Sequence, residues 1–364
     1  MLFDESGRLT ILRARFDEFT HQFCSCQSGG IAIAWSCEMN VYDDLMRRLT
    51  GVKTRATVRS PRRAPAQTGI MTPEKFDALV QAGYGQGHLE SYQPWLRITK
   101  RDYSPNSNVG HLVAKEFGHT HHPRSRLQRA LCHALAWLGA FDVRDQYPLW
   151  PFDHEHPIDG LMGVKRRQLV PGFVRIARDM GIDPGNYPAS TLDYVHILHT
   201  LSTWIDEDWK VRLVAHQIDS TCKEDLDDIG RSFEINLVRH CYCQHADIPF
   251  RLVKTRKLPG ELATVLDAIR PSIHREELSA TCQSDAYKVL VDTCSHCAYR
   301  DSASSVLKTL SRRHGMDVAF WTKLLHIALW RQDLDHDLGQ KLELYQPLIP
   351  GGIKLRAQLR LNLL

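Results

Sequence analysis

Two strand-like runs constrain the fold of this chain most. Residues 191–201 (TLDYVHILHTL) and 209–219 (WKVRLVAHQID) are rich in β-branched and aromatic side chains, and the polar segment STWIDED separates them. Runs of this composition on either side of a polar turn predict two paired strands. The segments that flank the pair then decide the fold class.

The flanking segments predict helices and further strands. Residues 125–150 predict a helix followed by a strand, because leucines recur there at spacings of three and four before a β-rich end. A longer helical segment over 228–246 and a strand over 249–255 follow the pair. Helix, strands, helix and strand in this order predict an α/β core with a mixed sheet.

Helical patterns lie on both sides of this core. Thr72 as N-cap and Pro73 at the first helical position predict a helix that closes at Gly83, and a short helix is expected around 176–180. From 261 onward, apolar residues at spacings of three and four predict helices over 285–300, 302–315 and 318–332. The segment DLDHDLGQKLELYQPLIPGG that follows is similar to a strand-turn-strand wing.

A basic segment marks a domain boundary. KTRATVRSPRRAPAQTG carries Arg59 and Arg62 among prolines and small residues. It is either a solvated linker or a linker that also follows phosphates, since such a segment buries little apolar area but gains affinity by releasing counterions. The expected parts of the chain are an extension without assigned function (1–52), the basic linker (53–70), a core domain (71–260) and a C-terminal domain (261–364).

The composition is that of an ordinary globular protein. Of the 364 residues, 43% are hydrophobic and 24% are charged, and the formal net charge is +4 with nineteen histidines. The longest uncharged apolar run, GGIAIAWSC, is too short to span a bilayer, and the mixed first residues do not resemble a signal peptide. We therefore expect a cytoplasmic protein without membrane association. The ten cysteines, which follow no regular spacing, are expected to be free thiols or metal ligands.

Six segments, in order, resemble the successive blocks of the TnsA endonuclease family, the nuclease partner in heteromeric transposases. They are GQGHLESYQPWL, HTHHPRSRLQRALCHALAW, FDVRDQYPL, IARDMGI, STLDYV and DIPFRLV, which together span roughly residues 72 to 260. The resemblance implies a restriction-endonuclease-like nuclease core, followed by a helical, winged-helix-like C-terminal domain. It also implies three partners: transposon-end DNA, a TnsB-like transposase subunit and a TnsC-like AAA+ ATPase regulator.

The resemblance implies catalytic positions that this chain fills unusually. The family uses a Glu on the first helix, an Asp on the next strand and a Gln-x-Lys on the strand beside it, which hold Mg²⁺ and orient the nucleophile. The helix Glu falls on Gln128, whose amide has no negative charge and binds Mg²⁺ far more weakly than a carboxylate. The strand Asp falls on Asp193 and is kept.

The Gln-x-Lys motif falls in VAHQIDS, where two registers are open. One register places Ala215 at the glutamine and Gln217 at the lysine; the other keeps Gln217 as the glutamine and places Asp219 at the lysine. The second suits a half-buried strand better, because it turns Ile218 inward. Neither supplies the lysine. Asp219 beside Asp193, with Lys223 reaching back, is a possible substitute metal site.

Other motifs have a structural and a functional interpretation. Gln86 and His88 in the first block either contact phosphate or stabilise a loop pinned by its aromatic side chains. His121 and His122 precede the first helix, where a structural or phosphate-facing role is favoured over zinc binding. HCYCQH and CSHC carry zinc-like residues, but both lie in predicted helices, where side chains two residues apart diverge.

Two classes of function therefore follow from the resemblance. The first is a non-catalytic or impaired subunit of a DNA transposition complex, which binds transposon-end DNA and the transposase and ATPase partners. The alternative is an active Mg²⁺-dependent endonuclease that cuts the 5′ (non-transferred) strand for cut-and-paste transposition. A stand-alone DNA-binding regulator is a third, weaker interpretation. Gln128 and the missing lysine favour the first.

Overall fold

The structure is a computed structural model of the chain, which describes residues 70–99, 110–166, 168–206, 208–219, 226–254, 257–270 and 275–364. These residues belong to a compact unit that extends to Leu364. The expected extension over 1–52, nearly all of the basic linker with Arg59 and Arg62, and Lys223 lie outside the described residues. Among the described residues, no helix is both long enough and apolar enough to cross a bilayer.

A four-stranded mixed sheet forms the centre of this unit. Its strands are β3 (Asp142–Leu149), β4 (His196–Ile205), β5 (Val211–Asp219) and β6 (Phe250–Lys254), and they lie in that order. β4 is antiparallel to both β3 and β5, whereas β5 and β6 run parallel. The predicted strand pair and the mixed α/β core are thus confirmed. A separate two-stranded sheet joins β1 (Leu112–Ala114) to β2 (His119–His121).

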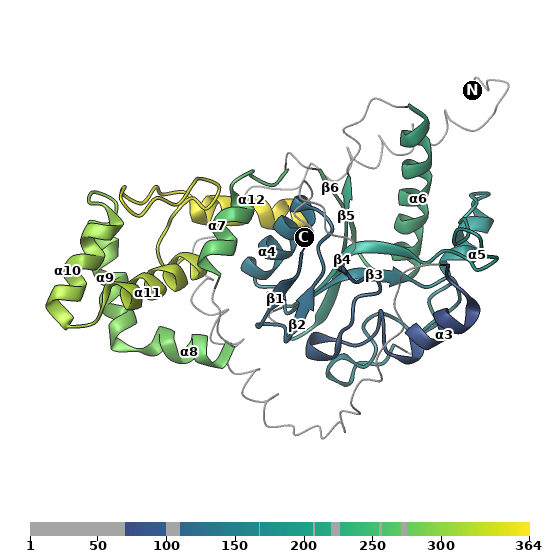
Figure 1. Cartoon of the computed structure of the whole chain (residues 1–364), viewed down its shortest axis with the longest axis horizontal. Coiled ribbons are helices and arrows are strands. Elements are labelled where there is room, and N and C mark those ends of the chain that lie inside the picture. Colours follow the sequence, from purple (N-terminus) through teal and green to yellow (C-terminus); the bar gives the residue numbers. More distant parts are fainter. Residues whose placement is uncertain are drawn as a thin grey trace. The chain divides into compact units, whose positions relative to one another are not determined.

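Helices cover both faces of the sheet (Figure 1). On one face, α4 (Arg126–Trp137) and α7 (Leu262–Ile269) share a hydrophobic core with Val143, Ile218 and Val253 of the strands. On the other face, α5 (Phe173–Asp179) and α6 (Leu226–His245) pack on Leu198, Leu201 and other strand residues. Because alternate side chains of a strand point to opposite faces, both faces of these strands are apolar.

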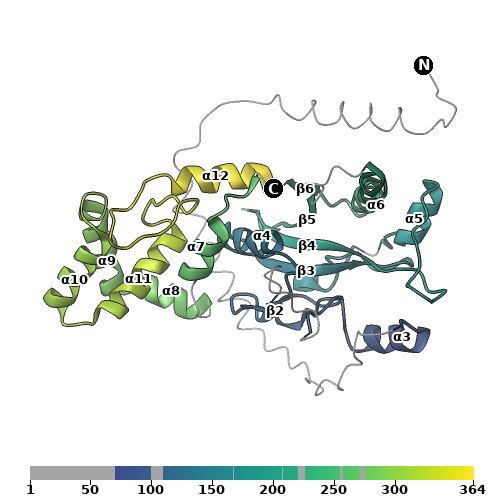
Figure 2. The ribbon, with the colours of Figure 1, turned by 45° about the horizontal axis from the view of Figure 1, so that its top comes forward.

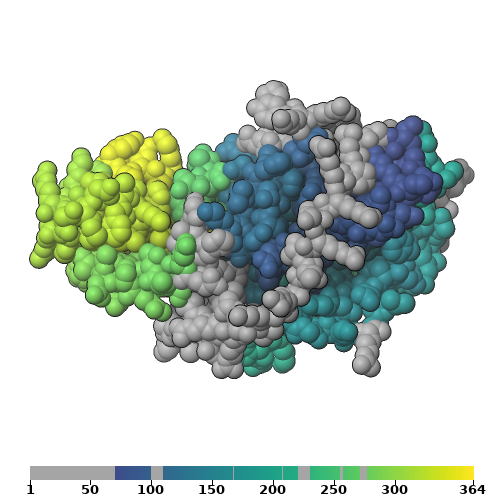
Figure 3. Space-filling view, turned by 60° about the horizontal axis from the view of Figure 1, so that its bottom comes forward, coloured from purple at the N-terminus to yellow at the C-terminus, as the bar shows by residue number. Residues whose placement is uncertain are grey.

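The glycine-rich segment GQGHLESYQPWL packs against β3. It follows α3 (Pro73–Gln81), whose N-cap Thr72 accepts a hydrogen bond from Lys75 N as the sequence predicts. Tyr92 and Trp95 are buried, and the Tyr92 hydroxyl donates to the Asp145 carbonyl at 2.7 Å. In Figure 3 the surface of residues 70–99 adjoins that of the segment beginning at 110. The bulky aromatics therefore anchor a loop to the edge strand of the sheet.

The C-terminal residues are helical, and they join the same hydrophobic core as α4. Figures 1 and 2 show α7 between α4 and the helices of residues 285–331, whereas the last helix of the chain runs back toward α4. Gly315 has φ 74° and ends α10, as expected of a C-cap glycine. The helices of this part are α8 (Arg275–Gln283), α9 (Asp285–Cys297), α10 (Ala303–His314), α11 (Val318–Arg331) and α12 (Gly352–Leu363).

The segment expected to form a wing, all of which the structure describes, contains no strand. Residues 333–351 form turns and irregular backbone, and their backbone hydrogen bonds reach the start of α10 and the residue after α9. Their carbonyls accept from that region, for example Leu344 O from Ser304 N at 2.7 Å. The alternation in KLELY suggests a strand, but these hydrogen bonds to helix ends replace a ladder, and Pro347 and Pro350 have no N–H to donate.

The loop approaches β3 so closely at Gly85 that there is no room for a side chain. The φ of Gly85 is +72°, and a Cβ there would lie 2.4 Å from Pro148 Cγ, whereas Gly181 has φ +69° with no atom within 4 Å of a Cβ. Both Gly→Ala changes introduce similar backbone strain, but only Gly85→Ala adds a steric clash. We predict that Gly85→Ala lowers the free energy of unfolding by about 1–3 kcal/mol more than Gly181→Ala, measured by urea denaturation. Equal decreases would contradict this packing.

Candidate functional site

Strands β4 and β5 separate in the middle of the sheet. Their ladder begins at the pair Ile205–Val211, next to the turn, and ends at the pair Thr200–His216. Beyond that point β4 continues beside β3, and β5 continues beside β6. Continuing the register by one step would bring His199 opposite Gln217, but this pair is not part of the ladder. We call the place where the strands separate, with the side chains of Gln128, Gln146, His199 and Gln217, the strand fork.

Glutamine side chains replace the missing ladder partners of His199. Its backbone N–H donates to Gln217 Oε1 at 3.3 Å, and its carbonyl accepts from Gln128 Nε2 at 3.0 Å. The imidazole also takes part, because Nδ1 accepts from the backbone N–H of Ile218 at 2.9 Å. Buried backbone groups must find partners, so these side chains allow the strands to separate.

The start of α4 fixes the position of Gln128. Ser125 is the N-cap, and its hydroxyl accepts from the Gln128 backbone N–H at 3.1 Å. The Gln128 side chain turns back, so that Oε1 accepts from Arg124 N at 2.9 Å. This exchange between the N-cap region and the third helical residue resembles a capping box. Gln128 is therefore buried and oriented toward the sheet by local helix geometry.

Gln146 completes the fork from the side of β3. Its φ of +50° is unusual for a residue other than glycine and interrupts the pairing with β4. Its amide donates to His122 O and to Gln128 Oε1, both at 3.1 Å, while its carbonyl accepts from Trp95 N at 3.3 Å. Backbone strain of this kind persists where surrounding contacts fix the residue, as they do here.

The electrostatic surroundings keep the fork uncharged at neutral pH. Burial, with a smaller contribution from the nearby Arg239, lowers the pKa of His199 to about 4. Burial also lowers the pKa of Arg239, to about 10. The guanidinium is held beside β4 by a hydrogen bond from Nε to Ile197 O at 3.1 Å. His199 is thus a neutral imidazole whose Nδ1 lone pair is already used.

These side chains do not fit a Mg²⁺ ion. Mg²⁺ in proteins is bound through carboxylates, with near-octahedral oxygen geometry. Among the described residues, no carboxylate is bonded to Gln128, His199 or Gln217. The two amide oxygens already accept hydrogen bonds from the protein, Gln128 Oε1 from two donors and Gln217 Oε1 from one. The fork can hold the sheet open, but it offers no ligand set for the ion.

The other catalytic positions expected from the sequence are only partly brought together. Gln217 lies in the fork, and Asp219 ends β5 two residues later. Asp193, which the sequence suggests as a strand residue, precedes β4 by three residues and forms an ion pair with Arg178 at 3.5 Å. The strand residue that meets Gln128 and Gln217 is His199, six positions further along. The roles proposed for Asp193 and Asp219 remain predictions.

The residues expected to face DNA differ in exposure. Gln86 is exposed, although its Nε2 donates to Val80 O at 2.8 Å. His88 is half-buried, and its Nε2 lies 2.9 Å from Asp159 O. Burial is also the main cause of the lowered pKa of His88. His121 and His122 are buried. Burial favours a structural role for these two histidines over contact with phosphate.

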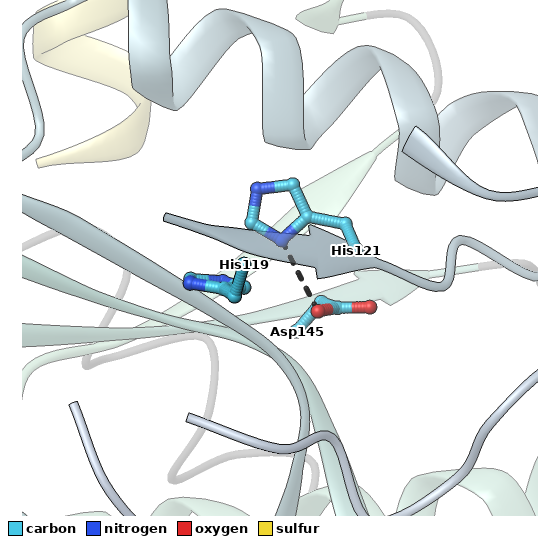
Figure 4. A group of neighbouring side chains, drawn as sticks. All are labelled: His119, His121 and Asp145. Atoms are coloured by element: carbon cyan, nitrogen blue, oxygen red, sulfur yellow. Dashed lines mark hydrogen bonds and ion pairs between the residues drawn. The ribbon is translucent and has the colours of Figure 1, made fainter. Parts of the chain in front are cut away.

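A second polar cluster lies next to the fork, where β2 meets β3 (Figure 4). His121 Nδ1 lies 3.2 Å from Asp145 Oδ1, and the His122 backbone N–H donates to Asp145 Oδ2 at 2.6 Å. His119 lies on the same side of β2, with Nε2 3.1 Å from Val143 O. By contrast, HCYCQH lies in α6 and CSHC closes α9, as their helical patterns predict.

Sequence reasoning missed His199, Gln146 and Asp145. The register of the strand pair was the available signal for His199, because a turn centred near Asp208 places it across from Gln217. The sequence around Gln146 gives no signal of its role, because its positive φ is imposed by contacts with residues distant in the chain. Asp145 lies in the quoted segment FDVRDQYPL, but its partners on β2 are more than twenty positions away in the chain.

Comparison with known proteins gives one limited similarity. No protein-family model matches the chain. Over 76 residues the chain is 36% identical to the transposon Tn7 transposition protein TnsA of Escherichia coli. The matched part is 20% of this chain and spans only 27% of the length of that protein. The similarity relates part of the chain to a transposition protein and leaves its own activity to be inferred.

The lowered pKa of His199 makes a prediction about acid stability. Because the folded-state pKa of about 4 is below the ordinary value of 6.5, the unfolded chain binds more protons between these values. The contribution of neutral His199 to the free energy of unfolding is complete above pH 6.5 and is lost as the pH falls toward 4. In His199→Gln, the dependence of unfolding free energy on pH should be shallower by up to about 1 kcal/mol per pH unit.

This difference is measured by urea denaturation of both proteins at pH 7, 6 and 5. Glutamine keeps an acceptor for the Ile218 N–H, so the variant retains the hydrogen bond without the titrating group. Parallel pH dependences in the two proteins would contradict a neutral, hydrogen-bonded His199.

Proposed function

We propose that this protein is a TnsA-like subunit of a DNA transposition complex in which cleavage of the 5′ strand is impaired or lost. In this role it binds transposon-end DNA, a TnsB-like transposase and a TnsC-like ATPase regulator. The similarity to the Tn7 transposition protein supports the transposition context. The mixed α/β core is compatible with a nuclease fold.

The observation that carries the impaired-cleavage part is the composition of the strand fork. In a nuclease of this type, the first helix and two adjacent strands bring carboxylates and a lysine to one point, where the metal activates water. In the strand fork, the Gln128 and Gln217 amides bond to the backbone of His199, and the neutral His199 imidazole accepts from Ile218 N–H. Removing one preorganised electrostatic group costs about a hundred- to a thousandfold in rate, so removing several leaves little activity.

The alternative proposal is an active endonuclease with a relocated site. It would rest on Asp193, Asp219 and Lys223, with Mg²⁺ held by the two carboxylates. An experiment distinguishes the two proposals. The purified full-length protein is incubated with its transposase and ATPase partners, Mg²⁺ and end-labelled transposon DNA, and 5′-strand nicks are counted.

We expect no 5′ nicks above those of a reaction without this protein, while strand transfer by the partners proceeds. An element of this kind should then move mainly as cointegrates, because its 5′ strands stay joined to the donor. Asp193→Asn is the decisive control, since it keeps the side-chain shape and removes the charge. Nicking by the unaltered protein that Asp193→Asn abolishes would overturn impaired cleavage and favour the relocated site.

DNA binding is tested separately from cutting. If the basic linker follows phosphates, the logarithm of the DNA affinity should fall linearly with the logarithm of the salt concentration. Arg59→Ala and Arg62→Ala should each reduce that slope by about one unit for every phosphate that the arginine neutralises. Filter binding at several salt concentrations gives the slopes. Binding that does not depend on salt would argue against a DNA-contacting role.

A further inference from the structure

The cluster of His119, His121 and Asp145 has the composition of a metal site. Each residue offers one ligand atom, and these atoms lie within 4.8 Å of one another. Two histidines separated by one residue on a strand point to the same side, so β2 presents both imidazoles together. β3 supplies the carboxylate from the opposite side, as Figure 4 shows.

Distances within the cluster are close to those between ligands of a bound ion. In a tetrahedral zinc site, with bonds of about 2.0–2.2 Å, adjacent ligand atoms lie about 3.3–3.5 Å apart. His121 Nδ1 and Asp145 Oδ1 are 3.2 Å apart. The ligand atoms of the cluster are separated by at most 4.8 Å, so a shift of about 1.5 Å in the widest pair would give the spacing of three ligands around one tetrahedral ion.

His119 is already held in the tautomer that a ligand needs. Its Nε2 lies 3.1 Å from the carbonyl of Val143, which can only accept, so the proton lies on Nε2. Nδ1 is then a free lone pair, and it is buried without a hydrogen-bond partner. A histidine that donates one ring N–H to a backbone carbonyl while its other nitrogen binds metal is the usual arrangement around bound ions.

Other buried polar atoms around the cluster also lack partners. His121 Nε2 has none, and neither has the hydroxyl of Thr200, which pairs with Asp145 across β3 and β4. Each of these side chains is at least nine-tenths buried. Buried polar atoms without partners are rare in native proteins, and an ion or a water is one of the usual reasons for them. Several in one place indicate that a bound species belongs there.

The ligand types select the metal. Two imidazoles and one carboxylate suit zinc and its first-row neighbours, whereas Mg²⁺ prefers oxygen ligands alone. A buried carboxylate is costly without compensating charge, and a divalent cation beside Asp145 would supply it. Phe117 and Tyr92 pack against the His119 ring and close the surroundings. Three protein ligands would leave the fourth tetrahedral position of the ion to a water molecule.

We propose that His119, His121 and Asp145 bind a zinc ion, or another first-row divalent cation of similar preference. The ion would join the β1–β2 sheet to β3 one residue before Gln146, and so support the strand fork from the N-terminal side. This site is separate from the Mg²⁺ position implied by the nuclease resemblance, and it does not depend on the proposed function.

The experiment measures the metal content of the full-length protein by mass spectrometry after purification without chelators. His119→Asn and Asp145→Asn remove one ligand each. His133→Asn is the matched control, because His133 is also fully buried and paired with a carboxylate, Asp267 at 3.1 Å, outside the cluster. We expect the wild type and the control to hold about one more zinc per chain than either cluster variant.

Measurements on the wild-type protein keep the proposal testable even where a variant does not fold. After chelation, zinc should raise the melting temperature more than Mg²⁺ at equal concentration, since only a ligand of the native state stabilises it. Cobalt added instead should give visible absorption without a thiolate charge-transfer band. Equal zinc content in control and cluster variants, or no stabilisation by zinc, would overturn the proposal and leave an ion pair of His121 and Asp145.

Discussion

The hydrogen bonds around His199 are the constraint on which the central sheet depends. Where β4 and β5 separate, a backbone N–H and a carbonyl would be buried without ladder partners, which costs about 1–3 kcal/mol for each group. Gln217 and Gln128 supply these partners from two different elements, and the His199 ring accepts from Ile218. The fork is therefore a connection between α4, β4 and β5 rather than an open gap between strands.

Two features on the side of β3 support this connection. The loop after α3 binds the β3 backbone through Tyr92 and Trp95, and Trp95 N–H satisfies the carbonyl of the strained Gln146. Asp145, one residue earlier, receives the backbone N–H of His122 and lies beside His121. Amides at such a point satisfy the backbone without burying charge, which carboxylates could not do. The proposed function rests on this difference: the amides of the strand fork stabilise the sheet but carry no charge to bind a catalytic metal.

Much of the architecture was predictable because it rests on local patterns. Helix α4 and strand β3 follow from leucine spacing and a β-rich run, and Thr72 and Gly315 cap their helices as expected. The wing prediction was wrong because alternation in KLELY does not show whether a ladder partner exists. The site was less predictable: Gln128 and Gln217 came from motif positions, whereas His199 and Gln146 depend on register and on a backbone conformation fixed by distant contacts.

The strand fork should have no place for a catalytic ion, and one measurement tests this directly. Crystals of the protein with duplex DNA would be soaked in Mn²⁺, which reports Mg²⁺ positions through its anomalous scattering. We predict no anomalous peak within coordination distance of Gln128, His199 or Gln217, and intact hydrogen bonds between the His199 backbone and the side chains of Gln128 and Gln217. A peak bound to Gln217 Oε1, with the fork opened around it, would contradict this prediction.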